Sequence, residues 1–247
     1  METKSDSIIL AMEPLEERNW LITCFTKNYG IITGYYKMKR NKPYGECISI
    51  YNTVHTTWKS STHGRSNKFH SIEKHDNNHM TLLLDRRNCI LLENARSILL
   101  QILKEKDPHE EIWECMKQFM DLLHDNNFIR KAALYVLLEA EILKFIGFGL
   151  TLNKCAVTGQ QHDLVYVSPK SGNAISSDIG KPYHDKLLPL PHFLQTAHCD
   201  MNTCTPDDVH NGLKLMTFFL NKHCFIHLTP ARQQLINTVI SIRATDT

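Results

Sequence analysis

The sequence predicts an α+β protein, in which a small N-terminal β-barrel precedes a mainly α-helical domain with a short β-hairpin inserted in it. Two patterns predict this order. Residues 7–72 contain five short runs rich in β-branched and aromatic residues, each bounded by turn residues. From residue 80 onward, apolar residues recur at helical spacing instead. We therefore expect a barrel domain in residues 1–78 and a helical domain in residues 79–247, with the hairpin at about 150–191.

The barrel strands are expected at residues 7–12, 20–26, 31–38, 47–58 and 68–72. Lys27-Asn28-Tyr29-Gly30 has the composition of a tight turn, because Asn and Gly tolerate positive φ. Gly34, inside the third strand, suggests a bulge or a sharp bend. Periodicity alone fits either an oligonucleotide-binding OB-fold or an SH3-like barrel.

Positive charge is concentrated in the barrel region. Nine Lys or Arg lie between Lys27 and Lys74, against two acidic residues, so this stretch carries +7 in a chain of net charge +2. Cations that neutralise phosphates, interleaved with tyrosines that stack on bases, indicate a nucleic-acid surface. A solvated sheet surface is the alternative. The candidate DNA-binding residues are Lys37, Lys39, Arg40, Lys42, Lys27, Tyr36, Tyr44, Lys59, Arg65 and Lys68. Tyr35 is a further stacking candidate, and either Tyr35 or Tyr36 is expected in the core.

Local start and stop signals define the helices. Apolar residues from 91 to 103 predict the first helix. Asp107-Pro108-His109-Glu110 predicts the start of the second, with Asp as N-cap and Pro in the first turn. The third runs from about residue 128 to 146 and ends at Gly147 and Gly149. Thr205-Pro206 and Thr229-Pro230 start two more. Between the third helix and these two, residues 164–167 and 174–176 predict the hairpin.

Composition and motifs restrict the classes of function. The N-terminus has no basic region leading into an apolar core, and three charged residues interrupt the most apolar window, so we expect a cytoplasmic protein without a signal peptide or a membrane span. Eight scattered cysteines favour reduced thiols. No phosphate-loop, dinucleotide-binding, nucleophile-elbow or zinc-protease motif is present, which predicts no enzyme activity and no cofactor.

Metal binding is the alternative reading. None of the fourteen histidines has a second ligand at a diagnostic spacing. A tetrahedral zinc site is formed by cysteine and histidine residues, and the candidates are Cys155, His198, Cys199 and Cys204. With such a site the chain would be a zinc-dependent enzyme. Because the spacing is loose, we expect no metal.

A family resemblance adds to these patterns. Gly147-Phe148-Gly149-Leu150, Cys155-Ala156-Val157-Thr158-Gly159 and the later Tyr166-Val167-Ser168-Pro169-Lys170-Ser171-Gly172 resemble the central region of the RecO family of bacterial recombination mediators. The similarity runs from residue 8 to about residue 236. It implies that the barrel is an OB-fold, which residues 21–30 also resemble. It implies a degenerate zinc knuckle as well, because relatives carry Cys-x-x-Cys where this chain has Cys155 and Thr158.

The resemblance also implies a function. It indicates a nucleoid-associated protein that binds single- and double-stranded DNA, anneals complementary strands and helps to load RecA together with RecR, with RecF as a further candidate partner. It also implies contact with the acidic C-terminal tail of single-strand binding protein, SSB. Such a tail needs an apolar pocket with cations at its rim, for which the candidates are Phe128, Arg130, Lys131, Leu134, Leu138 and Lys144. Relatives often carry arginine where this chain has Leu137. An OB-fold scaffold for RNA or DNA, without mediator activity, is the alternative.

Overall fold

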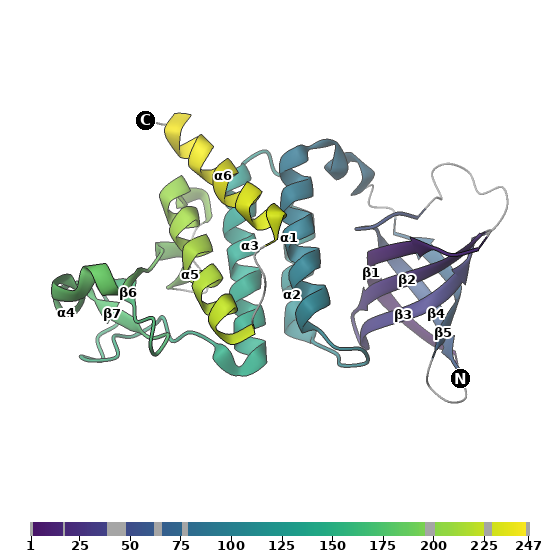
Figure 1. Ribbon diagram of the computed structural model, residues 1–247, viewed down its shortest axis with the longest axis horizontal. Helices are drawn as coiled ribbons and strands as arrows, with labels where there is room; N and C mark the ends of the chain where they lie inside the picture. The colour runs from purple at the N-terminus through teal and green to yellow at the C-terminus, as the bar shows by residue number, and fades with distance from the viewer. Residues whose placement is uncertain are drawn as a thin grey trace. The chain divides into compact units, whose positions relative to one another are not determined.

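Figure 1 shows the computed structural model of the chain, which describes residues 2–16, 18–38, 48–61, 66–75, 79–195, 201–224 and 229–245. The chain divides into two compact units, Met1–Trp113 and Glu114–Thr247. The division falls inside helix α2 (Glu110–Leu122), whereas the change from strands to helices occurs between residues 74 and 79. No helix in the described ranges is long and apolar enough to cross a bilayer.

The first unit is built on a closed barrel of five strands. The strands are β1 (Thr3–Pro14), β2 (Asn19–Thr26), β3 (Gly30–Lys37), β4 (Thr53–Ser60) and β5 (Asn67–Lys74). Their order around the barrel is β1-β2-β3-β5-β4, and β4 pairs back onto β1. Only the β3–β5 pair among these is parallel. This OB-like barrel confirms the predicted fold class (Figure 1).

Side chains alternate between the barrel interior and its outer face. The interior is apolar and includes Ile9, Ile22, Cys24, Ile32, Tyr36, Val54, Trp58, Phe69 and Ile72. One part of the outer face is buried as well, because the helical segments of this unit cover it. Phe25 packs edge-on against Trp113 at 5.4 Å between ring centroids, and the Tyr51 hydroxyl donates to Glu93 of α1 (Arg86–Ile102) at 2.8 Å.

Two predicted boundaries are wrong, and tertiary contacts explain both. The fourth strand was expected from residue 47 but begins at Thr53, because Tyr51 turns the chain with a φ of 67° and its N–H donates to the Ile9 carbonyl of β1 at 2.7 Å. Helix α2 was expected to begin at Pro108 with Asp107 as its N-cap, but it begins at Glu110. Asp107 is held against the barrel: a Cβ on Gly30, whose φ is +64°, would lie 2.0 Å from the Asp107 carbonyl oxygen. Only glycine fits that turn.

The second unit consists of helices and a small sheet. Its longer helices beyond α2 are α3 (Phe128–Leu143), α5 (Pro206–Cys224) and α6 (Pro230–Thr245), and its sheet contains β6 (Leu164–Val167), β7 (Ala174–Ser176) and β8 (Leu188–Pro189), with a short α4 (Ser177–Gly180) after β7. The predicted hairpin is confirmed as β6 and β7, whereas β8 was missed as a strand. Gly147, with a φ of 87°, ends the turn that follows α3, as predicted. The Thr205 hydroxyl accepts from the Asp208 N–H at 3.1 Å and caps α5.

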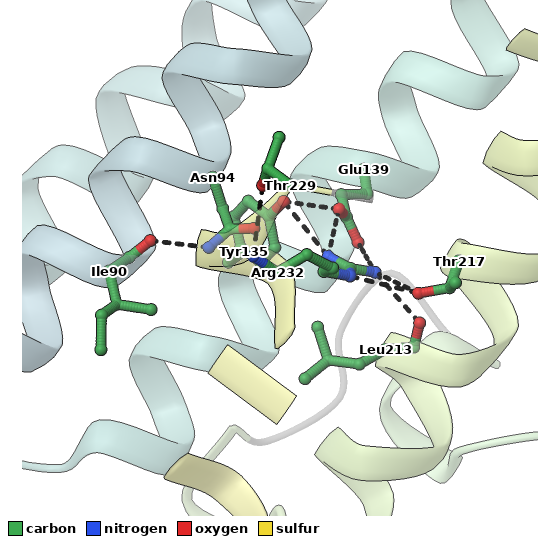
Figure 2. Close-up of polar contacts among 8 residues, drawn as sticks. All are labelled: Ile90, Asn94, Tyr135, Glu139, Leu213, Thr217, Thr229 and Arg232. Atoms are coloured by element: carbon green, nitrogen blue, oxygen red, sulfur yellow. Dashed lines mark hydrogen bonds and ion pairs between the residues drawn. The ribbon is translucent and has the colours of Figure 1, made fainter. Parts of the chain in front are cut away.

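A buried arginine joins three helices of this unit (Figure 2). Arg232 of α6 forms a two-point ion pair with Glu139 of α3, in which Nη2 lies 3.0 Å from Oε2, and both side chains are at most 6% exposed. Its Nη2 also donates to the Leu213 carbonyl and the Thr217 hydroxyl of α5, each at 3.0 Å. Burial raises the pKa of Tyr135 well above its usual value, so its hydroxyl stays protonated and donates to Glu139. Each buried charge is thereby compensated.

Truncation of this arginine should therefore be costly. Arg232→Ala is expected to lower the free energy of unfolding by about 3–5 kcal/mol, because Glu139 stays buried without its counter-charge. Replacing both partners by apolar residues, Arg232→Met with Glu139→Leu, should restore most of the loss. Arg243→Ala removes an exposed ion pair with Asp207 and should cost less than about 1 kcal/mol. Urea denaturation measures all three, and equal losses for Arg232→Ala and Arg243→Ala would contradict the assignment.

Candidate nucleic-acid interface

Exposed tyrosine and lysine side chains form a row across three neighbouring strands of the barrel. Tyr35 on β3 lies opposite Lys68 on β5, and Lys68 lies opposite Lys59 on β4. All three side chains face outward: Tyr35 is 51% exposed, and both lysines are exposed. Because neighbouring strands lie about 4.8 Å apart, an aromatic ring and two ammonium groups share one surface. We name these three residues the Tyr35 row. Lys37, exposed and two residues after Tyr35, extends it along β3.

A close contact between β3 and β5 holds this row in place. The buried Asn67 side chain donates to the Thr33 carbonyl at 2.9 Å and accepts from the Ser60 hydroxyl at 2.8 Å. A Cβ on Gly34 would lie 2.9 Å from the Asn67 carbonyl oxygen and 3.0 Å from the Phe69 ring. Glycine at position 34 therefore permits the close approach of β3 and β5. The predicted role of Gly34 as a bulge is thereby corrected to a close contact between strands.

The two adjacent tyrosines have opposite environments, and this corrects one site prediction. Tyr36 is only 5% exposed and belongs to the barrel core. Its ring has no free face on which a base could stack, whereas Tyr35 does. Trp58 is buried too and packs edge-on against Tyr29. The exposed stacking candidate on β3 is Tyr35.

The other predicted cations separate into two groups. Lys27 is half-buried in the turn before β3. Because the length of β3, roughly 23 Å, separates it from Lys37, it lies outside the Tyr35 row. The remaining candidates lie outside the described residues: Lys39, Arg40, Lys42, Tyr44 and Arg65.

The second unit contains an open, largely apolar cavity of about 670 Å³. Leu134, Leu137, Glu141 and Lys144 line it from one side of α3 and its C-terminal end, and Leu150 and Leu152 contribute from the segment that follows. The Lys144 ammonium lies 3.0 Å from a Glu141 carboxylate oxygen. The cavity thus combines an apolar wall with one exposed ion pair.

The six residues predicted for the SSB tail divide between this cavity and the interior. Leu134 and Lys144 line the cavity. Phe128, Lys131 and Leu138 are at most 4% exposed, so they are not available to an external peptide. Arg130 is half-buried and is paired with Asp125. Leu137 is also on the cavity wall.

The knuckle at Cys155 is held by hydrogen bonds. The buried Cys155 sulfur accepts from the Ser176 N–H at 3.4 Å. Burial opposes ionisation of this thiol, but hydrogen bonds from Ser176 and Thr158 outweigh it and lower its pKa to about 6. Among the described residues, no three metal-ligating side chains gather around Cys155. Cys204 is half-buried, and both His198 and Cys199 lie outside the described ranges. The described residues around Cys155 therefore do not fit a tetrahedral zinc ion.

Comparison with known proteins identifies the family. The family model described as "Recombination protein O C terminal" matches residues 84–229, more than half of the chain. The chain belongs to the RecO family. It is 32% identical to a DNA repair protein RecO of Wolbachia pipientis wMel over 98% of this chain and 100% of that protein. It is also 32% identical to the RecO proteins of Rickettsia canadensis (strain McKiel), over 91% of this chain and 90% of that protein, and of Methylocella silvestris, over 91% and 89%.

Membership of the RecO family supports a role in DNA repair and recombination. RecO proteins are repair mediators and do not form a family of catalytic enzymes. The family model covers the region from the end of the barrel to the start of α6, and the full-length relatives extend the similarity over the barrel. The resemblance recognised in the central region of the sequence is therefore confirmed.

The opposite environments of the two tyrosines make a direct test. Tyr36→Ala should lower the free energy of unfolding by about 3–5 kcal/mol, because it empties part of the barrel core. Tyr35→Ala, at an exposed position, should change it by no more than about 0.5 kcal/mol. Chemical denaturation of the two variants beside the unmodified protein measures both values. A larger loss for Tyr35→Ala than for Tyr36→Ala would mean that the strand register is different.

Proposed function

We propose that this chain is a recombination mediator that binds single- and double-stranded DNA through the outer face of its barrel. The observation that supports this proposal best is the Tyr35 row, in which an exposed ring lies beside two lysines on neighbouring strands. Lysines attract the phosphates, and a tyrosine ring stacks on a base without regard to its identity. Such a surface suits a protein that acts on DNA of any sequence.

The proposed surface continues along β3. Lys37 lies at the end of that strand, and Lys39, Arg40 and Lys42 follow within five residues in the sequence. Four cations in six residues add phosphate contacts to the stacking position at Tyr35. In our proposal these cations contact the same DNA as the Tyr35 row.

The mediator part of the proposal requires access to DNA that SSB covers. We propose that the cavity beside α3 binds the acidic C-terminal tail of SSB, with Leu134 and Leu137 against its apolar residues and Lys144 on its carboxylates. Glu141 competes for that lysine at 3.0 Å, so binding of the tail has to displace an existing ion pair. Cooperation with RecR in loading RecA, contact with RecF and an association with the nucleoid complete the proposed role.

Annealing of complementary oligonucleotides coated with SSB tests the whole function. Acceleration supports the mediator role, because it requires both DNA binding and access past SSB. If only uncoated strands anneal faster, the DNA surface stands and the tail site is wrong. If the chain binds RNA more tightly than DNA and accelerates neither reaction, it is an RNA-binding scaffold instead.

Variants of the Tyr35 row should separate stacking from charge. Tyr35→Ala is expected to weaken binding to single-stranded DNA by about 5- to 150-fold, since stacking on one aromatic ring is worth about 1–3 kcal/mol. Lys59→Gln with Lys68→Gln should reduce the slope of log affinity against log salt by about 1.4, because each phosphate contact contributes about 0.7. Fluorescence anisotropy at several salt concentrations measures both effects.

A charge-matched control accompanies these variants. Lys181→Gln with Lys186→Gln removes two exposed lysines of the second unit and should leave the salt slope unchanged. An equal change in slope for both pairs would show that binding depends on net charge and not on the row. A normal affinity for Tyr35→Ala would remove stacking from the proposal.

Substitutions at Glu141 and Lys144 in the cavity should change the affinity for the SSB tail in opposite directions. Glu141→Gln should strengthen binding of a labelled SSB tail peptide about fivefold, because it removes a carboxylate that competes with the tail for Lys144. Lys144→Gln should weaken binding by a similar factor. Leu137→Arg should strengthen it about tenfold, since it adds a charge-assisted contact to the tail. Lys186→Gln is the control for loss of one positive charge. If Glu141→Gln weakened binding, the tail would not be bound in this cavity.

A further inference from the structure

Three potential metal ligands converge on the outer surface of the barrel, away from the Tyr35 row. Asp6 on β1 lies opposite His55 on β4. His75 follows β5, and its main-chain N–H donates to the Thr53 carbonyl at 3.1 Å, which brings it beside the start of β4. One potential ligand atom from each of the three lies within 4.8 Å of the other two. The three residues are 49 and 20 positions apart in the sequence, so the barrel register brings them together.

One carboxylate oxygen is shared between the two imidazoles. Asp6 Oδ1 lies 2.5 Å from His55 Nδ1 and 3.5 Å from His75 Nε2, and the ring centroids are 4.0 Å apart. A zinc ion with ligands at 2.0–2.2 Å separates neighbouring ligand atoms by roughly 3.3 Å in tetrahedral geometry. The observed separations bracket that value. Small side-chain rotations are therefore enough to admit an ion between the three ligand atoms.

The surroundings of the cluster also suit a cation. The side chains of His55, Asp6 and His75 are 61%, 42% and 33% exposed, so water can complete the coordination shell. Glu73 on β5 lies opposite His55 in the register, is exposed and adds a second carboxylate to the same face. Because the ligands come from strands of a closed barrel, their spacing is largely set before any ion arrives.

We propose that Asp6, His55 and His75 form a surface site for a divalent transition-metal ion, beside the Glu73 carboxylate. Two imidazoles and one carboxylate select ions such as Zn²⁺ and Ni²⁺ over Mg²⁺ and Ca²⁺, which prefer oxygen ligands alone. The site is distinct from the cysteine knuckle in the second unit. It rests on the barrel geometry and does not depend on the proposed DNA role.

To test the site, the full chain is treated with a chelator and then titrated with NiCl₂, and binding is measured by calorimetry. One saturable site that requires these residues is expected, and MgCl₂ under the same conditions should give none. His55→Ala and His75→Ala should each weaken Ni²⁺ binding by at least about tenfold, since even loss of a residue that only supports a ligand costs 10- to 100-fold. Ni²⁺ should also raise the melting temperature of the unmodified protein but not that of His55→Ala.

His70→Ala is the matched control, because His70 is an exposed histidine on β5 that does not belong to the cluster. It should bind Ni²⁺ as the unmodified protein does. A cobalt titration adds a readout of ligand type, since ligation by His and Asp gives no thiolate charge-transfer band. The proposal is overturned if His55→Ala and His75→Ala bind Ni²⁺ normally, if no saturable site exists, or if Mg²⁺ binds as tightly.

Discussion

Closure of the barrel is the constraint on which the first unit depends. Each of its five strands pairs with two neighbours, so no strand can slip by one residue without turning its core side chains outward. The junction at Gly34 and Asn67 sets the β3–β5 register, because backbone and side chain meet there without room for a Cβ. The same register that buries Tyr36 exposes Tyr35. A core constraint thereby determines the chemistry of the surface.

A polar contact has the corresponding role in the second unit. Arg232 binds Glu139 and lies against Tyr135, and these two residues are one turn apart on the buried side of α3. Leu137 and Glu141 lie on another side of the same helix, four residues apart, and line the cavity. Fixing the buried side of α3 therefore fixes the orientation of its cavity side. The ion pair buried in the core and the exposed cavity are two consequences of one helix orientation.

Local chemistry accounts for what the sequence predicts correctly. Turn residues, caps and periodicity are properties of a few neighbouring residues, so the hairpin, the cap at Thr205 and the stop at Gly147 could be identified without a structure. Contacts between distant residues account for the failures. Strand β8 contains two residues and exists only because β6 lies beside it. The start of α2 is shifted because the barrel holds Asp107.

The candidate sites follow the same division. Alternation indicated that one of Tyr35 and Tyr36 is buried, but the choice required a register anchored by Asn67. Two predicted lysines, Lys59 and Lys68, are 9 residues apart in the sequence and become neighbours only through the β4–β5 pairing. Charge density along the chain found the correct region without finding this arrangement, since a linear count holds no information about strand neighbours.

The barrel also separates its two candidate sites. His55 and Lys59 both face outward on β4, four residues apart, which corresponds to about 13 Å along a strand. This distance exceeds the Debye length of about 8 Å at physiological salt, so an ion bound at His55 would add little attraction for a phosphate at Lys59. The ion would instead link β1 to β4 and to the end of β5, three strands that are neighbours around the barrel. The cluster of Asp6, His55 and His75 is therefore better placed to stabilise the barrel than to bind DNA.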